Sequence, residues 1–307
     1  MITLEKTVFC IAGPTASGKS AVAVKLAKTV GGEIINADSM QVYRDLHIIS
    51  ARPESSEMDG VPHHLFGHID GAQRYNVGAW LSEAVLIAKQ ISARGLHPIF
   101  VGGTGLYFKA LTEGLAVIPD AGNEAREQAE AILRDEGISA LRDQAEHLDY
   151  IAAGKVLGDD PQRLQRIVSV SLGTGKALST WQAQTVPAIA AESWTGAVLM
   201  PDRAALYARI NGRFEAMAEN GGLTEVSKLQ ERGLSTLLPV MKAIGVPELI
   251  RAENAADEMA VLSEIEMAKQ QTRRFAKRQM TWFRNQTPLW PKFDSGTALL
   301  EYWQDFA

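Results

Sequence analysis

"FCIAGPTASGKSAVAVKLAK", residues 9–28, joins a short apolar strand, a glycine-rich loop and the first turns of a helix. The loop fits the pattern G-x-x-x-x-G-K-[ST] and predicts a phosphate-binding loop with a strand before it and a helix after it. Backbone N–H groups in such a loop converge on a phosphate, the lysine neutralises oxygens and the serine hydroxyl can bind Mg²⁺. The predicted loop residues are Gly13, Pro14, Thr15, Ala16, Ser17, Gly18, Lys19 and Ser20, with Ser20 as the metal ligand. This chemistry serves any diphosphate or triphosphate, ATP included, so the loop alone leaves the reaction open.

Strand and helix signals alternate through the first third of the chain. Further apolar strands are expected at 31–39 and from His97, and an amphipathic helix is expected at 77–95. Such alternation is typical of a parallel sheet with right-handed crossovers, in which ligands bind at the carboxyl ends of the strands. The phosphate loop, Asp38 and the segment Gly102–Thr104 all follow strands. We therefore expect them to converge on one cleft.

The character of the sequence changes between residues 119 and 194, where helix-forming, solvent-facing residues replace apolar strands. Asp160, Pro161 and Gly173 are expected to be the N-cap, first residue and C-cap of a helix there. A strand returns at Gly196–Asp202. The predicted fold is α/β, with a P-loop core of parallel sheet and flanking helices at 1–118 and 195–307 and an all-helical insertion at 119–194.

Net charge, apolar segments and cysteine content indicate the compartment of the protein and how it can contact nucleic acid. The 307 residues carry 31 Lys and Arg against 36 Asp and Glu, a net charge of −5, so any contact with nucleic acid must come from local basic clusters. Neither a signal peptide nor an apolar run long enough to cross a bilayer is evident, and the single Cys10 suits a reducing compartment. We therefore expect a cytoplasmic enzyme with no membrane contact. The histidines at 63, 64 and 68 are interpreted as polar loop or core residues.

Two features bear on the chemistry. The strand from His97 ends in two glycines and a threonine, where a nucleotide-hydrolysing machine usually has a carboxylate, so Asp38 is the one strand-end carboxylate nearby. It can be a magnesium ligand, a base acting on a second substrate, or a surface N-cap.

The second feature is a basic segment, because residues 269–284 carry six basic side chains and no acidic one. On a helix they form either a solvated face or a contact with phosphate groups, and Arg163 with Arg166 offers a second basic spot.

Five segments together resemble the tRNA dimethylallyltransferases, also called tRNA isopentenyltransferases. They are GPTASGKS at 13–20, DSMQVY at 38–43, GGTGLY at 102–107, DPQRLQR at 160–166 and TRRFAKRQMTWFR at 272–284, and they occur in the order and spacing of that family. The resemblance covers nearly the whole chain. It implies transfer of a dimethylallyl group from dimethylallyl diphosphate to N6 of the adenosine immediately 3′ of the anticodon, position 37, in tRNAs that read codons beginning with U. It also implies Mg²⁺, and an insertion that grips the anticodon stem-loop of tRNA.

The resemblance also assigns residues. It implies that Asp38 accepts the N6 proton, that Thr104 bonds the bridging oxygen, and that Lys19 stabilises the leaving pyrophosphate held by residues 13–20. The tRNA-binding residues that it implies are Asp38, Ser39, Met40, Gln41, Thr104, Arg126, Gln162, Arg163, Leu164, Gln165, Arg166, Arg273 and Lys277. Arg273 or Lys277 can alternatively face the pyrophosphate. A monomer is expected.

Several positions depart from the family pattern. The usual G-T-A-K-P is ISARP at 49–53, so Ser50 and Arg52 keep a hydroxyl and a charge. Val246 and Pro247 stand where an aromatic and a basic residue are common, and Ser169 replaces a glutamate, so no RNA contact is carried over to these three positions. Without a Cys/His-rich tail, no structural zinc is expected.

Three rival functions remain open at this point. A P-loop small-molecule kinase would use the same loop for ATP, and a prenyltransferase of free adenylate would share the chemistry without gripping a stem-loop. A nucleotide-switched RNA-binding protein without catalysis would make Asp38 incidental.

Overall fold

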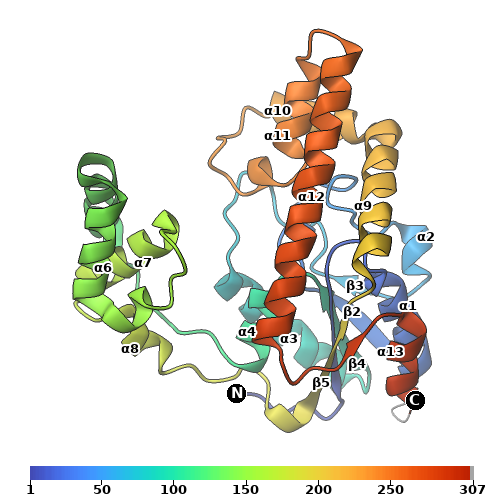
Figure 1. The fold of residues 1–307 in the computed structure, drawn as a ribbon. Helices are drawn as coiled ribbons and strands as arrows, with labels where there is room; N and C mark the ends of the chain where they lie inside the picture. The colour runs from blue at the N-terminus through green and yellow to red at the C-terminus, as the bar shows by residue number, and fades with distance from the viewer. Residues whose placement is uncertain (305–307) are drawn as a thin grey trace. The chain divides into compact units, whose positions relative to one another are not determined.

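The computed structural model describes residues 1–304, which fall into two compact units (Figure 1). Unit 1 comprises Met1–Thr112 and the chain from Ala188 onward, and unit 2 comprises Glu113–Pro187. The helical unit therefore begins and ends six to seven residues before the 119–194 expected from the sequence. No helix among the described residues is long and apolar enough to cross a membrane.

Unit 1 is built on six parallel strands in the order β3-β2-β4-β1-β5-β6, which confirms the predicted α/β class. The strands are β1 (Val8–Ala12), β2 (Gly32–Asn36), β3 (His63–His64), β4 (His97–Gly102), β5 (Trp194–Leu199) and β6 (Lys292–Phe293). The central strand β1 pairs with β4 on one side and β5 on the other, so that Cys10 lies opposite both Phe100 and Gly196. The two-residue strands β3 and β6 were not predicted because so short a segment has no periodicity.

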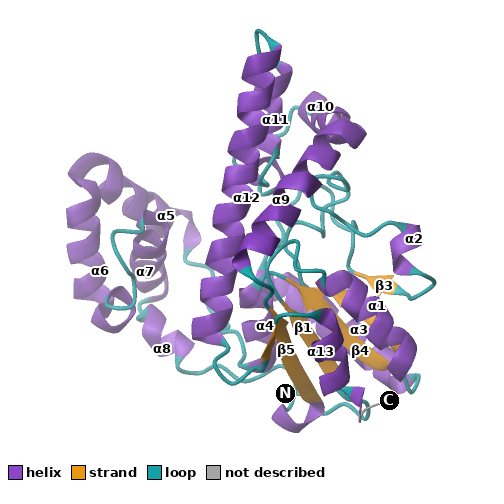
Figure 2. Cartoon of the chain, turned by 45° about the vertical axis from the view of Figure 1, so that its right-hand side comes forward, coloured by secondary structure: helices purple, strands orange, loops and turns teal. Residues whose placement is uncertain are grey.

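Helices cover both faces of this sheet (Figure 2). The helices of unit 1 are α1 (Lys19–Val30), α2 (Ser55–Met58), α3 (Val77–Ala93), α4 (Gly105–Thr112), α9 (Arg203–Met217), α10 (Leu223–Glu231), α11 (Val246–Glu253), α12 (Glu258–Gln286) and α13 (Gly296–Tyr302), with short helical turns η2 (Ala191–Ser193), η3 (Ala218–Gly222) and η4 (Val240–Lys242). Of these, α1 and α13 pack on one face of the sheet and α3 and α4 on the other, whereas α10 and α11 form a separate core with residues 42–49. Side chains of β1 alternate between the faces: Phe9 and Ile11 pack with α1 and α13, whereas Val8 and Cys10 pack with α3 and α4. Because both faces are covered, β1 is an unbroken apolar run.

Unit 2 is all helical, with α5 (Gly122–Ala131), η1 (Ile132–Glu136), α6 (Gly137–Ala153), α7 (Pro161–Thr174) and α8 (Leu178–Gln182). Asp160 caps α7 by accepting a bond from the Arg163 N–H at 3.1 Å, as predicted. The predicted C-cap at Gly173 is wrong, because α7 continues to Thr174 and ends at Gly175 with φ of 65°. Gly173 instead lies where a Cβ would meet the Ala121 carbonyl oxygen at 1.9 Å, so close helix packing explains that glycine.

The strand expected at 31–39 ends at Asn36, and the strand expected at Gly196–Asp202 is Trp194–Leu199. The earlier ends of the two strands have the same cause. Asp38 and Asp202 lie in turns, where each carboxylate accepts bonds from backbone N–H groups two and three residues ahead. Such side-chain bonds replace the sheet ladder.

Candidate active site

The phosphate loop follows β1 and leads into α1, at the carboxyl end of the central strand. Gly13 is required there because a Cβ would lie 2.5 Å from the Leu199 carbonyl oxygen at the end of β5. Gly18 has φ of 91° and is the N-cap of α1, so the first backbone N–H groups of that helix are left for a ligand. The Ser17 hydroxyl is buried and has no hydrogen-bond partner among residues 1–304. The loop thus has the shape of an anion cradle.

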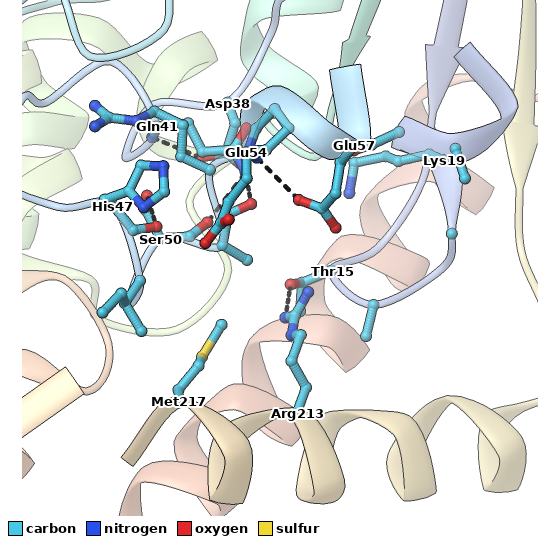
Figure 3. Close-up of a pocket in the computed structure, with 18 of the residues that line it drawn as sticks. Thr15, Lys19, Asp38, Gln41, His47, Ser50, Glu54, Glu57, Arg213 and Met217 are labelled. Carbon is cyan, nitrogen blue, oxygen red and sulfur yellow. Dashed lines mark hydrogen bonds between the residues drawn. The ribbon is translucent and has the colours of Figure 1, made fainter. Parts of the chain in front are cut away.

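A cavity of about 1140 Å³ opens beside this loop in unit 1 (Figure 3). Its walls come from the phosphate loop, the Asp38 turn, residues 47–57 and helix α9. The lining residues include Thr15, Ala16, Ser17, Gly18, Lys19, Ser20, Asp38, Gln41, His47, Ile48, Ser50, Ala51, Arg52, Glu54, Glu57, Arg209, Arg213, Met217 and Asn220. Of the three segments expected to converge on one cleft, the loop and Asp38 line this cavity, whereas Gly102–Thr104 is not among its lining residues.

Two of the cations that line this cavity are bonded to the phosphate loop. Lys19 donates from Nζ to the Pro14 carbonyl oxygen at 3.1 Å, and Arg213 on α9 donates from Nη2 to the Thr15 hydroxyl. Burial lowers the pKa of Lys19 from 10.5 to about 8; the Asp38 charge opposes this shift and the Arg213 charge adds to it. Two cations on this loop, one of them a largely desolvated ammonium, favour binding of a multiply charged anion.

Arg213 was missed by sequence reasoning. It lies in the segment RINGRFEAM of α9, whose buried side chains Ile210 and Phe214 recur at helical spacing and predict only an amphipathic helix. Packing of α9 along α12, visible in Figures 1 and 2, brings this arginine next to a loop 198 residues earlier in the chain. No local sequence pattern reports such a contact.

Asp38 is held by its own turn. Its Oδ1 accepts bonds from the N–H of Met40 at 2.9 Å and of Gln41 at 3.4 Å, while its backbone is bonded in both directions by the buried Asn36 side chain. Oδ2 takes part in neither of these bonds. The geometry thus orients the carboxylate through one of its two oxygens, which suits a general base.

Thr104 lies next to this turn without lining the cavity. Its Oγ1 accepts a bond from the Ser39 N–H at 3.0 Å and donates to the Ser39 hydroxyl at 3.3 Å, and its N–H donates to the Ala37 carbonyl at 3.1 Å. Ser39 and Met40 likewise lie outside the cavity lining, whereas Gln41 is part of it. The structure therefore joins the ends of β2 and β4 through Thr104.

Gln279 on α12 ties the phosphate loop to the end of β4 and is a second residue that the sequence did not reveal. Its Oε1 accepts a bond from the Thr15 N–H at 2.9 Å, and its Nε2 donates to the Gly103 carbonyl oxygen at 2.9 Å. The side chain is 5% exposed. A Cβ on Gly103 would lie 2.2 Å from Nε2, so this glycine makes room for the bridge.

Some of the basic side chains of α12 are already paired with other side chains of the protein. Arg273 bonds Asn211 Oδ1 at 2.6 Å and pairs with Glu266 at 3.0 Å, and Lys269 pairs with Glu215. Lys277 is exposed. Neither Arg273 nor Lys277 is among the residues that line the cavity.

The expected RNA-binding residues of unit 2 lie on two helices. On α7, Gln162, Arg163 and Arg166 are exposed, Gln165 is half-buried, and Leu164 is fully buried in the unit's core. A contact from Leu164 to RNA would therefore have to come from its backbone. Arg126 on α5 bonds Asn123 at 3.1 Å and pairs with Asp120.

The atypical positions have structural roles. Val246 and Ser169 are buried, and Pro247 occupies the first turn of α11, where its missing N–H costs nothing. The histidines pair separately: His64 with Glu33, His68 with Glu83, and His63 with the Val61 carbonyl. The described residues contain no cluster of three or more His, Cys, Asp or Glu side chains suited to a metal.

Comparison with known proteins places these features in one family. The family model described as IPP transferase matches residues 41–286, and the model described as isopentenyl transferase matches residues 6–66. The chain is 51% identical to a tRNA dimethylallyltransferase of Maricaulis maris over 94% of each chain, and 46% identical to one of Caulobacter sp. over 95% of this chain and 94% of the relative.

Solved structures agree with the sequence relatives. A eukaryotic dimethylallyltransferase acting on tRNA superposes with a TM-score of 0.78 at 29% identity, over 91% of this chain and 70% of that one. The tRNA isopentenylpyrophosphate transferase of Bacillus halodurans superposes with a TM-score of 0.66 at 34% identity, over 94% and 90% of the two chains. The chain thus belongs to the IPP transferase family.

Proposed function

We propose that this protein transfers a dimethylallyl group from dimethylallyl diphosphate to N6 of the adenosine immediately 3′ of the anticodon, in tRNAs that read codons beginning with U. Membership of the IPP transferase family and high identity to tRNA dimethylallyltransferases support the reaction. One observation in the structure carries it: an anion cradle with Lys19 and Arg213 shares a cavity with the oriented carboxylate of Asp38.

The cradle suits a leaving group. Adenine N6 is a weak nucleophile because its lone pair is delocalised into the ring, so the reaction needs a reactive allylic carbon. The bond from that carbon to oxygen loosens as negative charge builds on the departing pyrophosphate. Lys19, Arg213 and the N–H groups at the start of α1 stabilise this charge in a partly desolvated site. Pyrophosphate is then expelled intact, without hydrolysis for work.

Asp38 supplies the complementary step. The N6 proton becomes acidic only as the N–C bond forms, and a positioned carboxylate then accepts it. Oδ2 is the oxygen assigned to this proton, because Oδ1 is engaged by the turn. Thr104 fixes the neighbouring Ser39 backbone. Its hydroxyl is the group proposed to bond the bridging oxygen of the donor, and to do so it exchanges the bond that it donates to the Ser39 hydroxyl in the structure.

Mg²⁺ fits the donor set of this cavity. Ser20 is exposed in the lining at the start of α1, and its hydroxyl is a hard oxygen ligand. Mg²⁺ commonly keeps water and substrate phosphate ligands and takes few from the protein, so one hydroxyl ligand from the chain is in keeping with its chemistry. When bound, the ion would neutralise pyrophosphate charge.

The acceptor is proposed to be the anticodon stem-loop of tRNA, held in part by the exposed arginines Arg163 and Arg166 on α7. A net charge of −5 requires such local contacts. A base in a loop leaves its stack at a cost of a few kcal/mol, which favours a loop over a duplex. We also propose that the protein works as a monomer in the cytoplasm.

Acceptor labelling tests this function. The protein is incubated with radiolabelled dimethylallyl diphosphate and Mg²⁺, together with unmodified tRNA, AMP or ATP. Label should appear in the tRNA alone, and a tRNA with guanosine in place of the target adenosine should stay unlabelled. Labelled AMP would instead support the free-adenylate reaction, and phosphate transfer from ATP would support a kinase.

A further inference from the structure

The turn at residues 47–52 forms one wall of the active-site cavity. It is closed by two backbone bonds, from the Ala51 N–H to the Ile48 carbonyl at 2.9 Å and from the Arg52 N–H to the His47 carbonyl at 3.0 Å. Three consecutive N–H groups at its start, those of His47, Ile48 and Ile49, point out of the turn. They need an acceptor elsewhere, as at the start of any helical turn.

A single carboxylate on α10 satisfies all three groups. Glu225 Oε2 accepts from the His47 N–H at 2.7 Å and from the Ile48 N–H at 2.8 Å, and Oε1 accepts from the Ile49 N–H at 2.9 Å. Bonds from N–H groups to a carboxylate are stronger than those between neutral groups, and a negative charge is favoured at the start of a helical turn. Glu225 is therefore the main anchor of this end of the wall.

The other end of the wall is held from the Asp38 turn. Gln41 Nε2 donates to the carbonyl oxygens of Ser50 at 3.0 Å and Ala51 at 2.8 Å. The wall is thus fixed on one side to residues next to the proposed general base and on the other side to α10. Its conformation depends on side-chain bonds more than on its own backbone.

The wall and the phosphate loop lie on different sides of the cavity. In Figure 3, His47, Ser50 and Met217 lie on the side away from Thr15 and Lys19. A diphosphate bound by the loop would therefore direct its organic group toward this wall. Met217 and Asn220, which precede α10 in the chain, line the same cavity.

We propose that Glu225 is a positioning residue that fixes the wall at 47–52 and thereby sets the affinity of the cavity for the prenyl part of the donor. This rests on the proposed function, because it takes a prenyl diphosphate as the ligand. Glu225 is not among the residues that line the active-site cavity; it accepts three backbone bonds from the wall and lines a second cavity of about 540 Å³ with Lys228 and Arg232.

The test compares two ligands that share the diphosphate. Calorimetric titration of the full chain measures binding of dimethylallyl diphosphate and of inorganic pyrophosphate, each with Mg²⁺. Glu225→Ala should weaken binding of dimethylallyl diphosphate at least tenfold and change pyrophosphate binding less than twofold. Glu231→Ala, an exposed glutamate on the same helix, should change neither. In transfer assays Glu225→Ala should have a higher KM for the donor than the wild-type protein, whereas kcat and the KM for tRNA should be nearly unchanged.

Acetate provides a rescue that a general loss of structure would not give. The cavity beside Glu225 is open to solvent, so added acetate should restore part of the donor affinity of Glu225→Ala, and chloride at equal ionic strength should not. The proposal would be overturned if Glu225→Ala lost affinity for dimethylallyl diphosphate and pyrophosphate equally, or lost affinity for neither. It would also be overturned if acetate failed to restore donor affinity in a folded Glu225→Ala variant. Glu225→Gln, which keeps one acceptor oxygen, should fall between wild type and Glu225→Ala. A wild-type protein that binds pyrophosphate but not dimethylallyl diphosphate would refute the proposed donor itself.

Discussion

Replacing Gln279 with leucine should destabilise the protein and weaken donor binding together. The side chain is 5% exposed and bridges the Thr15 N–H and the Gly103 carbonyl oxygen with two bonds of 2.9 Å. Leucine has a similar size, so little cavity forms, but both backbone groups lose their partner. Each buried polar group left unpaired costs about 1–3 kcal/mol, and water can reach the partly buried Thr15. The expected loss is therefore about 2–4 kcal/mol in the free energy of unfolding.

Urea denaturation followed by circular dichroism measures this loss, and titration with dimethylallyl diphosphate measures the effect on the phosphate loop. Gln270→Leu is the matched control, because Gln270 is exposed on the same helix and its replacement should cost less than about 0.5 kcal/mol. If Gln279→Leu lost less than about 1 kcal/mol and kept the wild-type affinity for the donor, the bridge would not hold the loop.

Three further perturbations test the site and the RNA contacts. Asp38→Asn removes the proton acceptor and should lower kcat by about 10²-fold to 10⁴-fold with tRNA binding unchanged; near-normal turnover would reject the base. Because burial places the Lys19 pKa at about 8, the ammonium form that binds diphosphate is lost as pH rises through 8, so donor affinity should fall about tenfold between pH 7 and pH 9. Lys19→Met should bind weakly at every pH, and a wild-type affinity that is flat with pH would contradict this account. Replacing Arg163 and Arg166 together with alanine should flatten the slope of log affinity for tRNA against log salt by about 1.4–1.8 and leave donor binding intact; an unchanged slope would exclude these contacts.

The local features of the fold could be predicted because they are written in short stretches. An uncharged apolar run gives β1, and the loop at 13–20 and the cap at Asp160 follow from residue types at fixed spacing. Gly173 shows the limit of this reasoning, because a glycine near the end of a helix can serve close packing as well as a C-cap. The sequence gives no sign of Ala121, which lies against it.

The site could be predicted only where its residues follow strands. Asp38 and the phosphate loop do, and both line the cavity. Arg213, Gln279 and Glu225 come from helices whose patterns indicate only an amphipathic face, and each contacts a loop more than 170 residues away in the sequence. The basic segment at 269–284 was interpreted through its charges, whereas a neutral glutamine within it makes the contact with the phosphate loop.

The central claim is that the phosphate loop holds the pyrophosphate of a prenyl donor as a leaving group, and the stoichiometry of pyrophosphate release tests it most directly. Pyrophosphate and dimethylallylated tRNA are quantified in one reaction that contains the protein, Mg²⁺, unmodified tRNA and dimethylallyl diphosphate, without ATP. The account predicts one pyrophosphate released per prenylated adenosine, and no release when tRNA is omitted. Release of orthophosphate, or prenylation that requires ATP hydrolysis, would contradict it.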